Sequence, residues 1–483
     1  MKKQLLMFGS VLVFVVMSAV LIPSAYATNG MNLEGYGPIS TGMGGASMAY
    51  DNGAAAVMNN PATLGLMPQG DRLDVALGFL GPSITAEMSG MPDAKSSADA
   101  FFMPAMGWVN KTNNLVYGLG MFAQGGMGTE YEATSFMSGF EGMSFGFATP
   151  NQGSANLPVR SEVSMGRLLI PVAYNVNSDL TIGGTADFVW ASMDLKMVMG
   201  GAQMQDMIAF PFSTQAYGTI SGSMLGALAI ADPDGPVNWG YFNFSDKSDF
   251  TGKAKATGFA GKIGGVYKVN RQLAVGATYH SKTWLGDLEA SGATVLMNVN
   301  MDDASAGTIN PYTSSVTLPI TGKIKIKDFQ WPQTIGVGIS YDATDKLMIV
   351  FDYKWINWAA VMKDFKMSFT ADNGRGDLDA VLFQNWKDQN VFMLGAGYRI
   401  TNRFTLRGGV NVANNPVPDQ YLNPLFPAII KNHYTIGAGY IFSRASSTDV
   451  SFTYAPEVKQ AAASGVTSTH NQTSAQVMYS YRY

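Results

Sequence analysis

Segments in which apolar and polar residues alternate constrain this chain more than any other feature. From Asp71 onward the alternation predicts fourteen β-strands, separated by links that are short within each successive pair and long between pairs. An even number of antiparallel strands with short turns at one end and long loops at the other is typical of an outer-membrane β-barrel. The expected strands are near 73–86, 103–112, 115–125, 163–175, 179–196, 254–268, 272–289, 322–342, 346–361, 388–400, 403–413, 433–443, 448–456 and 472–483. The expected long loops are 87–102, 126–162, 197–253, 290–321, 362–387, 414–432 and 457–471.

The composition supports a membrane barrel. Only 14% of the residues are charged, against roughly 25% in an average soluble domain. After the N-terminus, no apolar run reaches the roughly 18 to 20 residues that a membrane helix needs. A soluble, secreted two-layer β protein is the alternative, but its solvent face would carry many charges. Here the polar faces consist mainly of Gly, Ser, Thr, Asn and Gln.

Two segments precede the expected strands. Residues 1–27 are expected to be a signal peptide, because Lys2 and Lys3 precede an apolar run that ends in a small-x-small cleavage site, 25–27. A single anchoring helix is the alternative. Residues 28–70, which are rich in Gly, Ala and Met, are expected to form a hatch that plugs the barrel, 71–483. The predicted fold class is therefore all-β, a fourteen-stranded antiparallel transmembrane β-barrel with an N-terminal hatch inside the lumen.

The charged residues of the strands are expected to face the lumen, because a Lys or Arg that faces lipid at mid-membrane costs roughly 2–4 kcal/mol. Among these, Arg167, Lys282 and Arg407 are candidates for holding a ligand carboxylate. The alternative is that the inward charges pair with one another and with the hatch. The expected lumen row comprises Arg167, Asp187, Lys262, His280, Lys282, Asp352, Lys354 and Arg407. Within 322–342, Trp331-Pro332 is expected to form a bulge in one strand, and the alternative is that it separates two strands.

Two long loops carry many methionine and phenylalanine residues. An exposed apolar surface of this kind usually marks a binding site, and methionine adapts to irregular apolar ligands. The alternative is that these side chains only pack the loops against each other. The candidate ligand-binding residues are Phe136, Met137, Phe140 and Met143 in loop 126–162, with Met204, Met207 and Phe210 in loop 197–253.

Glycine and proline mark two further places. Gly118, Gly120 and Gly125 lie in or just after the third expected strand, where glycine allows a kink. In the hatch, Asn60-Pro61-Ala62 is expected to form a rigid turn with either a structural or a gating role.

The sequence gives little support for catalysis or a metal site. The chain has no cysteine and three histidines, His280, His433 and His470, which are scattered along it and form no triad. We therefore expect no enzyme, no metal and no cofactor. The formal net charge of −4 gives no reason to expect nucleic acid as a partner.

The hatch segment, with its Asn60-Pro61-Ala62 triplet, resembles the FadL family of outer-membrane hydrophobic-compound transporters. The similarity continues through 117–123, 355–358, 406–409, 415–419 and 433–440, and so covers essentially the whole mature chain in one order. The resemblance implies a fourteen-stranded barrel closed by its hatch. It also implies that the ligand first binds an apolar external groove and then moves to a pocket near the mature N-terminus. From there it would leave sideways into the membrane at a kinked third strand.

The predicted function is passive uptake of hydrophobic small molecules, such as long-chain fatty acids or aromatic and aliphatic hydrocarbons, across a Gram-negative outer membrane. A general diffusion porin and a structural or adhesive barrel are the alternatives. The expected partners are the hydrophobic ligand, outer-membrane lipid, and the barrel assembly machinery through the C-terminal strand that ends at Tyr483. The identity of the ligand, the residues that contact it and the oligomeric state stay open.

Overall fold

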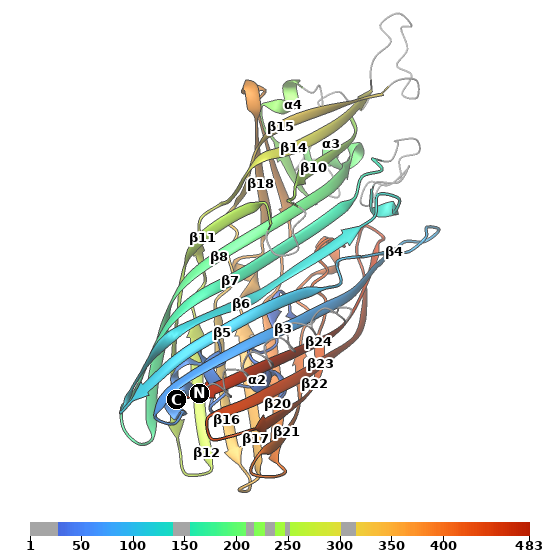
Figure 1. The fold of residues 1–483 in the computed structure, drawn as a ribbon. Helices are drawn as coiled ribbons and strands as arrows, with labels where there is room; N and C mark the ends of the chain where they lie inside the picture. Colours follow the sequence, from blue (N-terminus) through green and yellow to red (C-terminus); the bar gives the residue numbers. More distant parts are fainter. Residues whose placement is uncertain (1–27, 139–154, 209–216, 228–236, 247–251, 301–314) are drawn as a thin grey trace, which may run out of the picture.

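The protein is a closed, tilted β-barrel whose short turns gather at one end and whose long connections gather at the other (Figure 1). The computed structural model describes residues 28–138, 155–208, 217–227, 237–246, 252–300 and 315–483. The expected signal peptide, 1–27, lies outside the described residues. Among the helices in the described part, none is both long and apolar enough to cross a membrane.

The wall strands follow one another in chain order, each antiparallel to the next, and the last strand pairs with the first. Closure runs along almost the full length of both strands, from the pair Thr467 and Glu87 to the pair Arg482 and Arg72. The wall contains β3 (Gly70–Glu87), β5 (Phe101–Thr112), β6 (Leu115–Tyr131), β7 (Val159–Asn175), β8 (Leu180–Gly200), β11 (Ala254–Lys268), β12 (Leu273–His280), β16 (Thr334–Asp342), β17 (Leu347–Ile356), β20 (Gln389–Arg399), β21 (Phe404–Ala413), β22 (Asn432–Ile441), β23 (Ser446–Ala461) and β24 (Thr467–Arg482).

Above the wall, one side of the sheet extends well beyond the rest (Figure 1). The extension begins where the upper part of β8 pairs with β10, and it continues through neighbouring strands to β9. Its elements are β10 (Val237–Phe244), β14 (Leu288–Asn300), β15 (Ser315–Lys327), β18 (Asp364–Ala371), β19 (Asp377–Phe383) and β9 (Gly218–Ser221), with the helices α3 (Gly201–Ile208) and α4 (Met224–Ala227). Five further short segments occur in the connections of the barrel: β4 (Ala94–Lys95), β13 (Trp284–Leu285), η3 (Phe136–Ser138), η4 (Trp358–Ala360) and η5 (Asp372–Gly374).

The expected number of fourteen strands is wrong. The closed hydrogen-bonded circuit that passes through β10 and β14 between β8 and β11 counts sixteen strands. Lower down, β8 and β11 also pair directly. Strand β10 lies within the segment 197–253, which was expected to be a loop. Nearly all of its side chains are buried, on both faces of the strand. A strand buried on both faces shows no alternation of apolar and polar residues, so the pattern did not reveal it.

The expected continuous strand 322–342 is also wrong. The chain leaves the sheet between β15 and β16, at 328–333, and Trp331 there is fully buried. The chain also leaves the sheet between β17 and β18, at 357–363, and between β19 and β20, at 384–388. These two segments carry the buried Trp358 and Trp386. The hairpin of β18 and β19 was expected to be loop 362–387. Because the interruptions lie side by side, the wall has an irregular waist that separates the lower barrel from the extension.

Residues 28–69 lie within the barrel and are almost entirely buried. The segment, here called the hatch, has little regular structure, as its many glycines and alanines predict. Its elements are β1 (Thr28–Asn29), β2 (Asn32–Leu33), α2 (Pro38–Thr41), η1 (Gly53–Val57) and η2 (Pro61–Leu66). A second segment, 414–431 with η6 (Asp419–Tyr421), packs into the barrel from the extended end, and its apolar side chains Leu425, Ile429 and Ile430 are buried.

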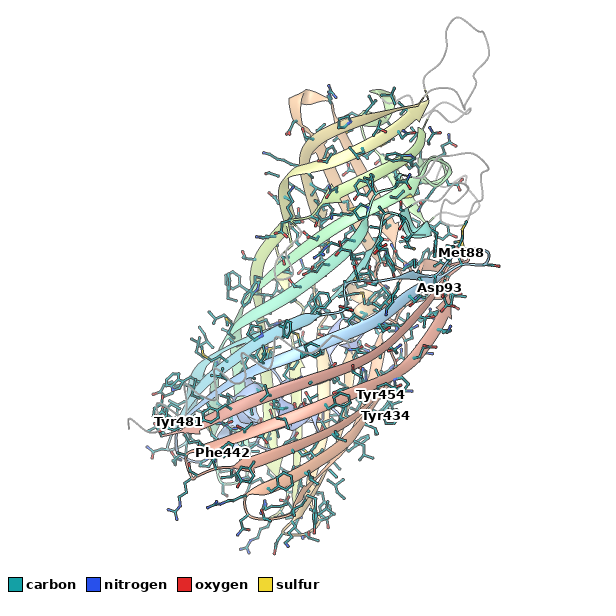
Figure 2. All side chains as sticks on the ribbon, turned by 45° about the vertical axis from the view of Figure 1, so that its right-hand side comes forward. Met88, Asp93, Tyr434, Phe442, Tyr454 and Tyr481 are labelled. Carbon is teal, nitrogen blue, oxygen red and sulfur yellow. The ribbon has the colours of Figure 1, made fainter. Side chains whose placement is uncertain are left out.

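The outer surface carries a broad apolar face with aromatic residues along it (Figure 2). Tyr434, Phe442 and Tyr454 project from the outer wall, where each is roughly half exposed. On β11, Ile263 is 66% exposed whereas its neighbour Lys262 is 3% exposed, so one residue step separates the lipid face from the lumen.

Replacing Ile263 with Lys should therefore destabilise the folded barrel, because the new charge faces lipid. We expect a loss of about 2 kcal/mol in the free energy of unfolding, which urea titration in phospholipid vesicles measures. Ile263→Ala is the matched control, since it removes the same side chain without adding a charge. Equal effects of the two substitutions would contradict the assignment of this face to lipid.

Candidate functional site

The backbone of the hatch lies directly on the inner wall, and glycine makes this approach possible. A Cβ atom at Gly276 of β12 would overlap the carbonyl oxygen of Met48. In the same way, a Cβ at Gly125 of β6 would overlap the carbonyl of Met31. Because these contacts come from two different strands of the wall, the hatch is seated against the barrel at more than one place.

Polar bonds fix the same segment. The carboxylate of Asp352 on β17 accepts hydrogen bonds from the backbone amides of Ser47 (2.5 Å) and Met48 (3.0 Å). Asn60 donates to the carbonyl oxygens of Met48 (2.8 Å) and Gly265 (3.2 Å). These bonds tie the hatch to two wall strands.

The triplet Asn60-Pro61-Ala62 forms the start of η2. The side chain of Asn60 caps this helix by accepting from the amide of Ala62 (3.1 Å), and Pro61 occupies its first turn. The triplet thus has a structural role in the described hatch, and its gating role stays a prediction.

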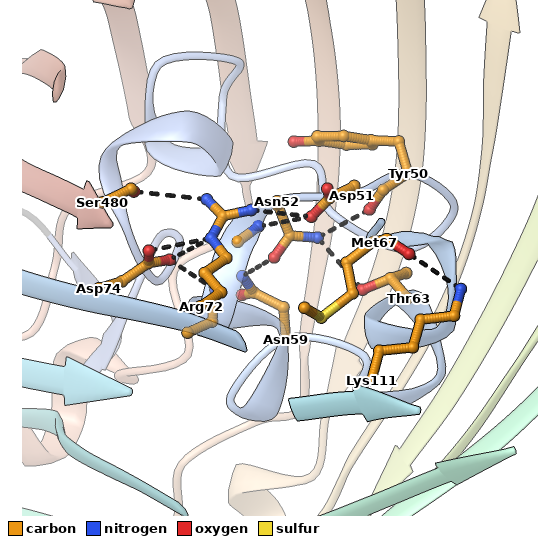
Figure 3. Close-up of polar contacts among 12 residues, drawn as sticks. Tyr50, Asp51, Asn52, Asn59, Thr63, Met67, Arg72, Asp74, Lys111 and Ser480 are labelled. Atoms are coloured by element: carbon orange, nitrogen blue, oxygen red, sulfur yellow. Dashed lines mark hydrogen bonds and ion pairs between the residues drawn. The ribbon is translucent and has the colours of Figure 1, made fainter. Parts of the chain in front are cut away.

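Charged residues surround the lower part of the hatch (Figure 3). Arg72 pairs with Asp74 at 2.9 Å and reaches Asp51 of the hatch at 3.4 Å. On the other side, the ammonium group of Lys111 donates to the carbonyl oxygen of Met67 (2.8 Å), close to where the hatch ends. Arg72 therefore links acids of the wall and the hatch, and Lys111 of β5 binds the end of the hatch.

The candidate luminal cations separate into two that face inward and one that does not. Arg167 is fully buried, and it shares Asp187 with Lys262 at nitrogen–oxygen distances of 2.6 Å and 2.7 Å. Arg407 pairs with Asp449 at 2.8 Å, below the hatch. The alternative weighed from the sequence, pairing of inward charges with one another, therefore describes both arginines.

Lys282 was expected in the lumen, and that placement is wrong. The residue is exposed, while its neighbours Ser281 and Thr283 are buried. The chain leaves regular strand geometry between β12 and β13. A one-residue shift there exchanges the two faces, so the alternation that holds for β12 does not extend to this lysine.

The first residues of the hatch lie against three tryptophans of the waist. Trp331 donates to the side-chain oxygen of Asn32 at 2.6 Å. Trp358 packs on Trp331 and Trp386 with ring centroids 5.7 Å and 5.3 Å apart, and Gly30 lies against its indole. The start of the hatch therefore sits in an aromatic pocket.

Nearby, Glu34 is buried and accepts from the hydroxyl of Thr453 at 3.1 Å. Burial raises the pKa of Glu34 to about 7, although hydrogen bonds and the charge of Lys354 oppose the shift.

The wall has a discontinuity between β5 and β6. Pairing of the two strands ends at Met106 and Met121, although both strands continue. Beyond this point, Asn32 of the hatch pairs with Gly125 of β6, and β6 has a register shift between Ala123 and Gly125. A narrow cavity of about 30 Å³ lies here. Of the kink candidates, Gly118 and Gly120 stand opposite β5 in the regular part of the ladder, so the irregularity lies at Gly125.

At the extended end, a groove of about 50 Å³ lies between the extension and segment 414–431. Its lining is mainly apolar, with amide groups at its edges. The lining residues are Met197, Val198, Met199, Gln203, Tyr217, Leu382, Phe383, Gln384, Gln420, Tyr421, Leu422, Asn423 and Ser464.

The candidate loop residues that the structure describes do not line this groove. Met204 and Met207 of α3 are buried and pack toward Gly240 and Gly218, and Phe136 and Met137 are buried in the same apolar cluster. Phe140, Met143 and Phe210 lie outside the described residues. The groove residues on β19 and η6 were missed because both elements lie in expected loops, where composition was the only signal.

A barrel wall with an apolar outer face, an internal hatch and an external apolar groove defines an outer-membrane transport protein. The family model for "Outer membrane protein transport protein (OMPP1/FadL/TodX)" matches residues 15–481. The chain therefore belongs to this family, and the resemblance identified from the sequence is confirmed. The family is one of transport proteins of the outer membrane and not of enzymes, which also confirms the expected location.

Solved and curated relatives agree with this assignment. The structure of the Pseudomonas putida toluene transporter TodX is 28% identical, with a TM-score of 0.78 over 94% of this chain and 99% of that chain. Outer membrane protein P1 of Haemophilus influenzae is 22% identical over 77% of this chain and 69% of its own length. An uncharacterized Chlorobium limicola protein is 44% identical over 103 residues, 21% of this chain, and the match spans about half of that relative, 49%.

Replacing Asp352 with Ala should loosen the hatch, because two buried backbone amides lose a charged acceptor. Hydrogen bonds to charged groups contribute roughly 1.5–3 kcal/mol each, so we expect hydrogen exchange at 43–60 to accelerate at least tenfold. Asp179→Asn, in an exposed turn, is the control. Unchanged exchange in D352A would show that the carboxylate does not hold the hatch.

Proposed function

We propose that the protein imports small, neutral, apolar molecules by passive diffusion, and that monoaromatic hydrocarbons are the class that fits best. The observation that carries this proposal is the apolar groove at the extended end, which lies above a lumen filled by protein. The similarity to the toluene transporter TodX supports the choice of class. Methionine, leucine and tyrosine side chains can enclose a flat apolar ring without polar partners.

The paired charges around Asp187 and Asp449 support a neutral ligand over a fatty acid at these two places. Arg167 and Lys262 both bind Asp187, and Arg407 binds Asp449. A ligand carboxylate at either place would have to displace an aspartate and leave it buried without its cation, which is strongly destabilising. An apolar molecule passes without breaking these pairs.

The proposed path leads from the groove, past segment 414–431, to the aromatic pocket around Trp358 and then to the cavity beside β6. At its end, the first residues of the hatch cover the edge of β6 through the pairing of Asn32 with Gly125. Withdrawal of these residues would open the wall toward the membrane. The gating role of Asn60-Pro61-Ala62 and recognition of the C-terminal strand by the assembly machinery stay predictions.

The alternatives differ in what they require of the lumen. A general diffusion porin needs a hydrated channel, which does not suit a barrel that holds the hatch and segment 414–431 inside it. A structural or adhesive barrel needs no apolar groove. A structural or adhesive barrel also does not account for the chain's membership in a transport family.

Deletion of 28–67 tests the plug. Without it we expect the barrel to pass ions, so its conductance in planar bilayers should rise from near zero to steady open steps. The intact chain in the same bilayer is the control. A deletion variant that inserts and stays closed would argue against a plug, and an intact chain that conducts freely would favour the porin.

Replacing Leu382 with Gln tests the groove, because a polar amide in the apolar lining should weaken binding of an aromatic ring. We expect uptake of labelled toluene by Gram-negative cells that express the variant to fall roughly fivefold, as for about 1 kcal/mol of lost transfer energy. Phe392→Gln, on the outer wall, is the control. Equal uptake by L382Q and the wild type would exclude the groove as the entry site.

A further inference from the structure

The outer face of the barrel carries a group of four lysines where the wall meets the extension. Two of them lie at the start of β11 and two on β15, on either side of the first residues of β14. Three of the four are exposed and the other is partly exposed. We name them the basic patch: Lys253, Lys255, Lys323 and Lys325.

The register of the strands brings these lysines together. Lys255 of β11 stands opposite Glu289 of β14, and Glu289 stands opposite Lys325 of β15. Because adjacent strands lie about 4.8 Å apart, the two lysines flank Glu289 at a backbone separation of about 10 Å. Two residues further along β14, Ser291 stands opposite Lys323. The patch therefore spans three neighbouring strands on one face of the sheet.

A bulge in β14 brings in the fourth lysine. The register shifts between Ser291 and Ala293, and Gly292 at the bulge has a positive φ of 65°. The ammonium group of Lys253 donates to the carbonyl oxygen of Gly292 at 2.6 Å. This bond holds a positive charge beside the hydroxyl group of Ser291, which is exposed.

The basic patch has more positive than negative charge. Its acids are Glu289, which pairs with Lys325 at 2.5 Å, and Asp287, whose charge also acts on Lys325. In the part of the chain that the structure describes, the ammonium groups of Lys255 and Lys323 have neither a hydrogen bond nor an ion pair. The next lysines on this face, at the end of β15 and on β18, each pair with an aspartate. The unbalanced charge is therefore confined to the patch.

The basic patch lies at the upper edge of the lipid-facing surface. On β11 the outward side chains Phe259 and Ile263 are each 66% exposed, and Tyr267 stands on the same face near the short turn. A transmembrane strand crosses the bilayer core in roughly 9–11 residues. A strand that enters the core at Tyr267 therefore leaves it just below Lys255.

Large apolar side chains project from the wall directly below the patch. Phe259 stands opposite Trp284 of β13, which is 61% exposed. Aromatic side chains of outer-membrane barrels gather at the level of the lipid headgroups. Exposed cations above exposed rings match an amphiphile whose head carries negative charge and whose body is apolar.

We propose that the basic patch binds the phosphate groups of a glycolipid of the outer leaflet, of the lipid A type. The acyl chains of this glycolipid lie against Phe259, Ile263 and Trp284. The ammonium groups supply charge and several donors for each phosphate, and Ser291 adds a hydroxyl group. The patch faces the outer leaflet because it lies toward the end where the long connections gather (Figure 1). The inference goes beyond the proposed function, since it holds whichever molecule is imported.

The test measures binding of lipid A to the full chain in detergent micelles, by titration in native mass spectrometry. We expect lipid A with its two phosphates to stay bound, and the same lipid without phosphates to dissociate. Lys255→Gln combined with Lys323→Gln removes two charges at exposed positions. This double variant should bind lipid A roughly 25-fold more weakly, as for about 1 kcal/mol for each lysine.

Lys268→Gln combined with Lys346→Gln is the matched control. It removes the same charge from two exposed lysines at the short turns, at the other end of the barrel, and should bind lipid A as the wild type does. A second measurement needs no variant. Lipid A should slow the chemical acetylation of Lys255 and Lys323 in the wild type, and should leave that of Lys268 and Lys346 unchanged.

Equal binding of lipid A by the two double variants, or equal binding of the lipid without phosphates, overturns the proposal. Phosphatidylglycerol that binds as tightly and protects Lys255 and Lys323 as well would show a surface for any anionic lipid, which overturns the choice of a glycolipid. These outcomes are independent of hydrocarbon uptake, which the groove variant tests.

Discussion

The contact between the hatch backbone and the bare glycines of the wall is the constraint on which the structure depends. Met31 and Met48 place their carbonyl oxygens where a Cβ on Gly125 or Gly276 would stand. Any larger residue at these wall positions would push the hatch off and open the lumen. Glycine costs stability in a strand, and the barrel recovers that loss by burying the hatch against its wall. The high glycine content of the chain follows partly from this need.

The two ends of the hatch are held differently. Its middle and its end are fixed by charged or backbone bonds to β3, β5, β11 and β17, through residues such as Asp352 and Lys111. Its first residues rest on aromatic rings, on the hydrogen bond from Trp331 to Asn32 and on a backbone pairing with β6, and have no charged partner there. Rings that pack without charged bonds permit a shift at little cost, so movement is expected at the start of the hatch and not in its centre.

The sequence predicted the barrel, the outer-membrane family and most strand positions, because lipid and lumen impose strict alternation on a wall strand. It failed where that rule does not apply. Strand β10 is buried on both faces, and the irregular residues after His280 exchange the faces, which misplaced Lys282. The groove was unpredictable for a different reason: Leu382 and Tyr421 are distant in sequence and meet only through the extension. The pairing of Arg167 with Asp187 was left open, because alternation predicts which face of the sheet a side chain lies on but not which residue it contacts.

The selectivity of such a barrel depends on whether the charged and polar groups of its interior already have partners within the protein. Where cations and acids are already paired, as around Asp187, an incoming charge finds no partner and pays the full loss of its hydration. Along the proposed path, the groove and the aromatic pocket offer apolar side chains and rings, with a few amide groups beside them. The paired charges therefore favour the passage of neutral molecules over ions.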